Sequence, residues 1–234
     1  MSYGEPMPIA GTEPGPTVGR DVDRAIRDLQ RGKPVLVHDF DDREGETDLI
    51  YPALSVQPHD VARLRNDAGG LICVALSHEV ADAFDLPFLA DEIDHPAAEA
   101  SHLGYDERSS FSLPVNHREN HTGITDLDRS VTITRLGAAA ARPKTVTFHE
   151  EFRTPGHVNV LRAAPKLLEE RRGHTELGLA LAAEAGRAPA VVVCEMLDDG
   201  TGDALGKSAA KSYAMHNDLV YLEGQRIAEY FDAA

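Results

Sequence analysis

The chain has 234 residues, of which 42% are hydrophobic and 26% charged, a globular composition that can bury a sizeable core. Its net charge of −16 repels nucleic-acid phosphates and anionic lipids, and no apolar run reaches the roughly 18 residues that span a bilayer, so we expect no nucleic-acid partner and no membrane partner. No apolar segment precedes the first basic residue, Arg20, and the two cysteines lie far apart, which favours a reducing, cytoplasmic location and no zinc site built from cysteines.

Residues 1–20 hold four glycines and four prolines with no periodic apolar face, and we predict that they form a flexible N-terminal extension. Asp21 then opens a helix whose apolar residues repeat at helical spacing until Gly32. The next predicted elements are strands at 34–37 and 49–54, a short helix opened by Pro58, a buried strand at 71–76 and a short helix capped by Ser77.

Residues 87–108 are acidic and irregular, and we expect a mobile loop there. No internal repeat and no compositional break follows residue 20. We therefore predict an α+β fold with α/β-type layers, in which residues 21–234 form a single domain with a mixed β-sheet core flanked by helices. The remaining predicted elements are a strand at about 110–115, a helix at 127–141, strands near 145–149 and 157–162, a helix at 175–185 capped by Thr175, a central strand at 190–196, a helix at 207–216, a strand at 219–222 and a terminal helix.

The segment 39–48 packs six carboxylates and one arginine into ten residues between two predicted strands. Such crowding is repulsive unless a cation or a positive substrate group lies among the carboxylates. Because hard divalent cations prefer oxygen ligands, Mg²⁺ or Mn²⁺ is the natural candidate. A solvated acidic turn on an already acidic surface would give the same pattern.

A second group of polar residues precedes the helix predicted at 175–185. Arg171, Arg172 and Thr175 surround a helix N-terminus, which favours binding of an anion and in particular of phosphate, while His174 could ligate a metal. An exposed basic loop with an ordinary N-terminal cap is the competing interpretation.

Two further residues, His157 and Glu195, lie at the ends of predicted strands and are candidate catalytic residues. His157 begins a strand after a forced turn, a position suited to proton transfer, although a lone histidine is often structural. Glu195 ends an apolar strand, where a carboxylate is costly unless it is paired or used.

Taken in order, these segments resemble the 3,4-dihydroxy-2-butanone 4-phosphate synthases of riboflavin biosynthesis over about residues 21–222. No single motif decides this, but an ordered set is hard to obtain by chance. The set consists of Gly32-Lys33-Pro34-Val35, Asp39, Asp42-Arg43-Glu44-Gly45-Glu46-Thr47-Asp48, Gly70-Leu71-Ile72-Cys73, Ser110-Phe111-Ser112, Thr122-Gly123-Ile124-Thr125, Asp128-Arg129-Ser130, Pro155-Gly156-His157, Gly173-His174-Thr175-Glu176 and Cys194-Glu195.

The resemblance implies a monofunctional lyase that converts D-ribulose 5-phosphate to 3,4-dihydroxy-2-butanone 4-phosphate and formate. It also implies Mg²⁺ or Mn²⁺, with two ions per active site, no organic cofactor, and a homodimer with shared active sites. The roles that it implies are metal ligation by Glu44 and His174, catalysis by Asp39, Glu44, His157 and Glu195, and substrate binding by Arg43, Glu44, Asp48, Arg171, Arg172, Gly173, His174, Thr175 and Glu195.

Three positions depart from the family's usual motifs: Gly45-Glu46-Thr47-Asp48 replaces Asn-Glu-Gly-Asp, Thr154 separates Arg153 from Pro155, and Arg172 replaces a glycine. Two other functions stay open. They are a non-catalytic sugar-phosphate sensor that kept the pocket, and a nucleotide-binding relative with a similar core.

The basic residues comprise five lysines and 18 arginines. An acidic, lysine-poor surface suits a cytoplasm of high salt concentration, because salt screens the repulsion between like charges. The composition therefore favours a halophilic source, although an ordinary acidic protein from a GC-rich genome has the same bias.

Overall fold

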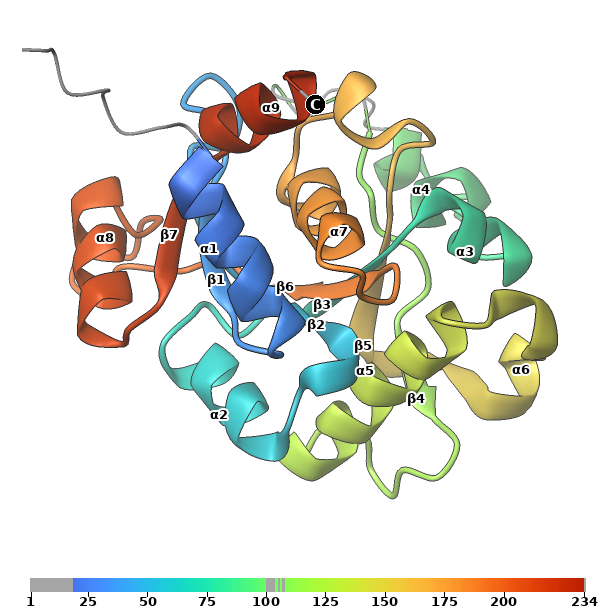
Figure 1. Ribbon diagram of the computed structural model, residues 1–234. Helices are drawn as coiled ribbons and strands as arrows, with labels where there is room; N and C mark the ends of the chain where they lie inside the picture. Colours follow the sequence, from blue (N-terminus) through green and yellow to red (C-terminus); the bar gives the residue numbers. More distant parts are fainter. Residues whose placement is uncertain (1–18, 100–103, 105, 107, 234) are drawn as a thin grey trace, which may run out of the picture.

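One mixed β-sheet forms the centre of the computed structural model, which describes residues 19–99, 104, 106 and 108–233 (Figure 1). Its seven strands run in the order β4-β5-β3-β6-β2-β1-β7. The pairs β1–β7 and β3–β5 are parallel, and the other neighbouring pairs are antiparallel. The strands are β1 (Val35–His38), β2 (Thr47–Pro52), β3 (Cys73–Leu76), β4 (Val115–His117), β5 (Phe152–Arg162), β6 (Ala190–Val193) and β7 (Val220–Glu223). The predicted α+β fold with a mixed sheet is therefore confirmed.

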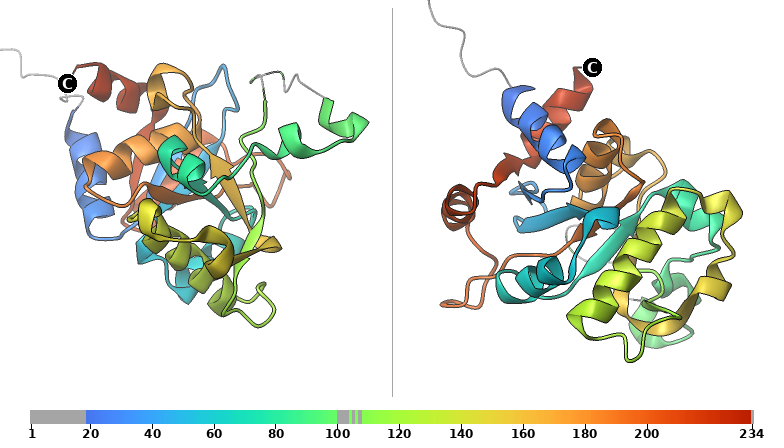
Figure 2. Two further views of the ribbon diagram at one scale, coloured as in Figure 1. Left: turned by 90° about the vertical axis from the view of Figure 1, so that its right-hand side faces the viewer. Right: turned by 60° about the horizontal axis from the view of Figure 1, so that its bottom comes forward.

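Helices cover both faces of this sheet (Figure 2). The first layer consists of α1 (Gly19–Gln30), α7 (His174–Glu184) and α9 (Gly224–Asp232), and the second of α2 (Pro58–Asn66), α3 (His78–Ala83), α5 (Asp126–Ala140) and α8 (Lys207–His216). Two short helices remain: α4 (Leu89–Glu92) buries none of its residues, and α6 (Phe148–Glu151) packs Phe148 against the cluster under the second layer. None of the described helices is both long and apolar enough to cross a membrane.

The two-residue period of the strands explains why both layers can pack. Along β1, Val35 and Val37 join the cluster under α1 and α7, while Leu36 between them joins the cluster under α2 and α5. The strands β1, β2, β3 and β6 are buried along their whole length, and their residues are apolar except for His38, Thr47 and Asp48 at the ends next to the acidic segment.

Most predicted elements are present, with shifted ends. The first helix begins at Gly19 rather than Asp21, so residues 19–20 of the predicted extension are helical, and residues 1–18 lie outside the described part. The predicted loop at 87–108 contains α4 and a 3₁₀ turn, Pro96–Glu99, while 100–103, 105 and 107 also lie outside.

The strand predicted near 145–149 is wrong. This segment forms a 3₁₀ turn, Pro143–Thr145, and then α6. The Phe148 ring stacks between Phe84 and Phe152, with centroids 5.0 and 4.7 Å away, so its apolar character reflects aromatic packing rather than strand pairing.

Two other local predictions need correction. Instead of a strand at 110–115, Phe111 makes one isolated bridge to Leu161, and regular pairing starts only at β4, after Pro114, which has no N–H to donate. Thr175 does not cap its helix, because the N-cap of α7 is Gly173 and Thr175 lies in the first turn.

Candidate active site

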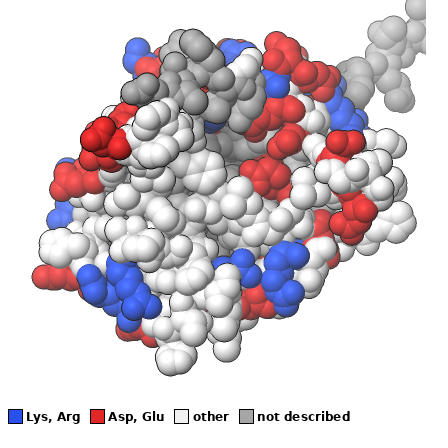
Figure 3. All heavy atoms as spheres, turned by 180° about the vertical axis from the view of Figure 1, so that it is seen from behind, with Lys and Arg blue, Asp and Glu red and all other residues white. Residues whose placement is uncertain are grey.

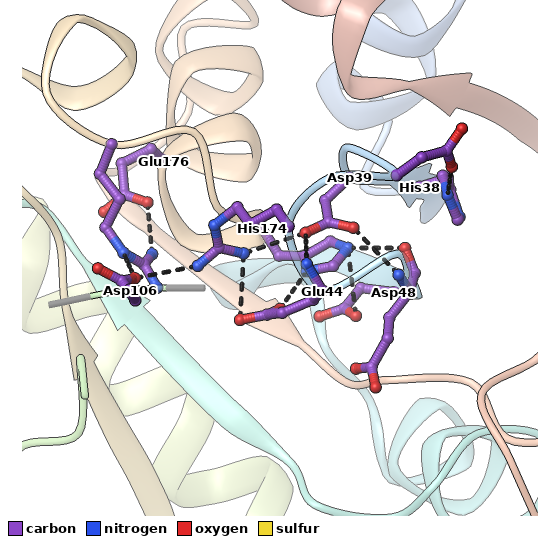
Figure 4. Close-up of polar contacts among 11 residues, drawn as sticks. His38, Asp39, Glu44, Asp48, Asp106, His174 and Glu176 are labelled. Carbon is purple, nitrogen blue, oxygen red and sulfur yellow. Dashed lines mark hydrogen bonds and ion pairs between the residues drawn. The ribbon is translucent and has the colours of Figure 1, made fainter. Parts of the chain in front are cut away.

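The acidic segment is the connection between the antiparallel strands β1 and β2. Asp39, which follows β1, is buried, and its carboxylate accepts hydrogen bonds from Arg43 Nη1 (3.0 Å) and from the backbone N–H groups of Glu44 (3.2 Å) and Glu46 (3.0 Å). The Asp39 N–H in turn donates to the Glu46 carbonyl. These bonds fold the connection back on itself and turn Glu44 toward α7 (Figure 4).

His38, the last residue of β1, contacts two residues of the same connection. Its Nδ1 lies 3.0 Å from Thr47 Oγ1 and its Nε2 lies 3.2 Å from Asp41 Oδ1. Lys207, at the start of α8, also donates to Asp41. Asp41 therefore faces away from Glu44 and serves to anchor the loop.

His174, the first residue of α7, lies at the centre of a carboxylate cluster. Its Nδ1 is 3.3 Å from Glu44 Oε2, and its Nε2 is 3.5 Å from Asp48 Oδ1 and 3.2 Å from the Glu46 carbonyl oxygen. Asp48 Oδ1 is buried without a hydrogen-bond partner among the described residues. Glu195, which follows β6, forms an isolated bridge with Asp48 across the sheet. An orphaned carboxylate oxygen beside a histidine fits a cation site.

The cluster shifts the protonation of its own members. Burial lowers the pKa of His174, but Asp48, Glu44 and Asp39 outweigh it and raise that pKa to about 9. Burial, reinforced by neighbouring carboxylates, raises the pKa of Glu46, Glu195 and, most strongly, Asp48. Although burial opposes it, the contacts with His174 and Arg43 lower the pKa of Glu44. The site thus holds one carboxyl group whose pKa is lowered, Glu44, beside carboxyl groups whose pKa is raised.

Arg43 and Arg171 share one carboxylate partner on the positive side of the site. Asp106 Oδ2 accepts from Arg171 Nε (2.6 Å) and Arg43 Nη2 (3.1 Å), so one carboxylate bridges both guanidinium groups. A Cβ atom on Gly173 would lie 2.4 Å from Arg171 Nη1 and 3.0 Å from Arg43 Cζ. Glycine at this position therefore leaves room for both arginines at the start of α7.

These groups surround one cavity of about 260 Å³. It brings together Arg43, Glu44, Asp48, Arg171, His174, Thr175 and Glu195 of the predicted site, and its other lining residues are Glu46, Cys73, Arg108, Ser109, Ser110, Phe111, Leu161 and Val193.

Four predicted site residues do not line the described part of this cavity. One of them, Gly173, lies beside Arg171 and Arg43 at the start of α7. Asp39 lies behind the acidic loop with both oxygens engaged. The Arg172 side chain is exposed, with its guanidinium 6.0 Å from the centre of the Phe40 ring. His157 is exposed on β5, where Asn116 Nδ2 lies 3.0 Å from its Nδ1.

Sequence reasoning missed several residues of the site. Glu46 and Cys73 stood inside quoted motifs, so the motifs could have identified them. Arg108 and Asp106 come from the irregular 87–108 segment, where no spacing predicts a contact. Glu176 was quoted in the Gly-His-Thr-Glu motif, but only the fold shows that it contacts Arg171.

The donor set suits a hard divalent cation. One oxygen each of Asp39 and Glu44 and one nitrogen of His174 lie within 4.8 Å of one another, and Asp48 adds an oxygen that accepts no hydrogen bond from the described residues. Carboxylate and imidazole ligands of this kind fit Mg²⁺ or Mn²⁺.

Comparisons with known proteins agree on one family. The family model described as 3,4-dihydroxy-2-butanone 4-phosphate synthase matches residues 23–230. Relatives with that name include proteins of Archaeoglobus fulgidus, 48% identical over 90% of this chain and 94% of the relative, and of Methanosarcina acetivorans, 47% identical over 90% and 91%. A solved structure described as such a synthase in complex with two magnesium ions is 29% identical, with a TM-score of 0.77 over 91% of this chain and 97% of that chain.

The affinity for a divalent cation should increase as pH rises, because the cation binds the neutral imidazole of His174. The cation therefore has to displace the imidazole proton, which the neighbouring carboxylates stabilise. Below the pKa of about 9, affinity should rise about tenfold per pH unit, with about one proton released per ion. Calorimetric titration with Mn²⁺ in two buffers of different ionisation enthalpy measures both quantities. His216→Gln, at an exposed position of α8, is the control and should change neither. Affinity that is independent of pH, without proton release, would contradict this assignment.

The same linkage has a second readout in the metal-free protein. The folded pKa of His174 lies above its ordinary value of 6.5, so its stabilisation is complete below pH 6.5 and is lost as pH rises through about 9. Thermal melts should show the metal-free protein losing stability over this range, with saturating Mn²⁺ reducing the loss.

Proposed function

The chain belongs to the 3,4-dihydroxy-2-butanone 4-phosphate synthase family, and we propose that its acidic cavity is the active site. The protein is a lyase of riboflavin biosynthesis, and its reaction converts D-ribulose 5-phosphate to 3,4-dihydroxy-2-butanone 4-phosphate and formate. The main support for placing the active site there is the contact between Glu44 and His174, which line the same cavity as Arg43 and Arg171. We propose that residues 21–234 form the single catalytic domain.

Glu44 and His174 are the proposed metal ligands. Their contact of 3.3 Å and the orphaned oxygen of Asp48 support a cation there, and a relative of known structure holds two magnesium ions. We propose two Mg²⁺ or Mn²⁺ ions per active site and no organic cofactor. When bound, such a cation polarises a ketone and stabilises negative charge on its oxygen atoms.

The proposed phosphate site is the start of α7 together with Arg171. The carboxylate of Asp106 between Arg43 and Arg171 indicates that an anionic group fits beside these guanidinium groups. Thr175 and the free N–H groups of the first helical turn add further donors. Arg172 contributes positive charge from outside the cavity. Phosphate binding would thus hold the substrate at a distance from its reacting carbons.

Proton transfer requires a carboxyl group that can take up a proton as well as release one. Asp48 and Glu195 face the cavity, and burial raises the pKa of each. We propose that these two carboxyl groups exchange protons with the sugar, whose oxygen atoms Arg43 also binds. Asp39, with three hydrogen bonds to its carboxylate, would act mainly by holding the loop in place.

A homodimer accounts for the position of His157. The residue lies outside the cavity of its own chain, next to Asn116, against which Gly123 also packs. The adjoining loop and helix expose two large apolar side chains, Ile124 (51% exposed) and Leu127 (67%). We propose that this surface contacts a second copy of the chain and that each subunit supplies His157 to its partner's cavity.

The alternative functions lack a supporting observation of their own. A non-catalytic sugar-phosphate sensor would not need carboxyl groups with raised pKa values beside a cation site. A nucleotide-binding relative is not favoured either, because the family model and the relatives named above are all described as synthases of this family.

The purified protein should release formate from ribulose 5-phosphate in the presence of Mg²⁺ and stop when EDTA is added. Glu44→Gln should lower the rate by more than about 100-fold, because losing a ligand costs more than losing a residue that only orients one. Glu79→Gln, the same change at an exposed site on α3, should keep full activity. No formate from the native protein, or undiminished formate release in EDTA, would refute the assignment.

Shared active sites predict complementation between inactive subunits. His157→Ala and Glu44→Gln should each be inactive alone, yet a mixture allowed to exchange subunits should regain about a quarter of native activity, since half of the dimers then carry one intact site. The comparison is formate release before and after exchange. Demonstrated exchange without any recovery would show that His157 acts elsewhere.

We further propose that the protein works in the cytoplasm, where its two buried thiols stay reduced.

We also propose that the acidic surface is an adaptation to high salt. Acidic side chains gather beside a hollow on one face of the molecule (Figure 3). Because the Debye length falls from about 30 Å at 0.01 M to about 3 Å at 1 M salt, KCl should relieve their repulsion. Melting temperature and dimer content should therefore rise with KCl up to molar concentrations. A flat melting curve with a constant dimer would contradict the adaptation but not the catalytic assignment.

A further inference from the structure

Glu176 lies outside the cavity, yet it contacts a residue that the proposed phosphate site depends on. We propose that Glu176 is a positioning residue that fixes the guanidinium of Arg171 for binding of the substrate phosphate. This inference rests on the proposed function, because it concerns the same phosphate site.

Each carboxylate oxygen of Glu176 accepts one hydrogen bond. Its side chain is fully buried in the first turn of α7, with Oε2 accepting from Arg171 Nη1 at 2.7 Å and Oε1 accepting from the Ala164 N–H at 3.0 Å. Ala164 lies just beyond the end of β5. The carboxylate therefore joins three segments that meet at the phosphate site, namely the end of β5, the loop before α7 and α7 itself (Figure 4).

A charged residue at this position has a cost that an apolar residue would avoid. Taking a carboxylate out of water is unfavourable, and an ion pair in the interior repays this only with good geometry and further hydrogen bonds. The Glu176–Arg171 pair meets both conditions. An apolar residue at position 176 would nevertheless stabilise the fold about as well. Its distinctive effect is to give the Arg171 guanidinium one direction.

That direction matters because arginine is long and flexible. Glu176 holds Nη1 and Asp106 holds Nε, so the Arg171 side chain is already ordered before any ligand arrives. A phosphate that meets a preorganised arginine avoids the entropy cost of ordering it. Without Glu176 that cost would fall on binding, which predicts a KM about 3- to 10-fold higher.

Glu176→Gln tests the inference, because glutamine has one acceptor oxygen where Glu176 uses two. The KM for ribulose 5-phosphate and the dissociation constant of inorganic phosphate should both rise about 3- to 10-fold, while kcat at saturating substrate and Mg²⁺ stays within about twofold. Glu184→Gln, the same change at an exposed site of α7, is the matched control and should alter neither constant.

A double-mutant cycle distinguishes positioning from a purely structural role. If Glu176 acts through Arg171, Glu176→Gln should have no further effect on phosphate affinity in an Arg171→Ala background. An equal loss in both backgrounds, or unchanged KM and phosphate affinity in the single variant, would overturn the inference. Should Glu176→Gln fail to fold, Glu176→Asp, which retracts the carboxylate by one methylene, carries the same prediction. Because phosphate titration needs no turnover, its result stands even if the proposed reaction is not observed.

Discussion

The site depends on repulsion between carboxylates that the fold places together out of bulk water. Glu44, Glu46, Asp48 and Glu195 surround the imidazole of His174 in one cavity. This repulsion and burial raise the pKa values of Asp48 and Glu195, and the negative charge of the cluster raises the pKa of His174 to about 9. A divalent cation would offset the same repulsion and would displace the proton of His174. We propose that the same repulsion drives metal binding and proton transfer at this site and favours the arginines that face the cluster.

The fold creates this arrangement with a small number of local devices. An antiparallel hairpin brings the two ends of the acidic segment together, and Asp39 folds the segment by accepting three hydrogen bonds. The antiparallel pairing of β2 with β6 places Glu195 opposite Asp48, and α7 begins at His174 directly above them. Glycine at position 173 leaves room for Arg43 and Arg171 at that helix end. The site is therefore built from element ends on a rigid sheet, where small displacements are resisted by the buried core.

The sequence predicted the parts of this arrangement that leave a periodic or local signal. Helix α1 and the buried strand around β6 follow from apolar spacing, and the acidic segment follows from charge density alone. The 145–149 segment misled because aromatic stacking on Phe84 and Phe152 gives the same apolar pattern as a strand. Contacts between distant residues leave no local signal at all. Asp106 and Arg171 are separated by 65 positions, and nothing in their spacing announces the bridge between them. The resemblance to a known family grouped His157 with the site, whereas the fold leaves it on a separate exposed surface.

Locating the cation directly is the sharpest test of this account. Crystals grown with Mn²⁺, and diffraction data collected at the manganese absorption edge, would show each ion as an anomalous peak without reference to activity. The account predicts a peak within about 2.0–2.5 Å of a Glu44 carboxylate oxygen and of a His174 ring nitrogen. Manganese bound only elsewhere on the acidic surface, with the Glu44–His174 contact intact and no peak beside it, would contradict the claim that this carboxylate cluster is a metal site.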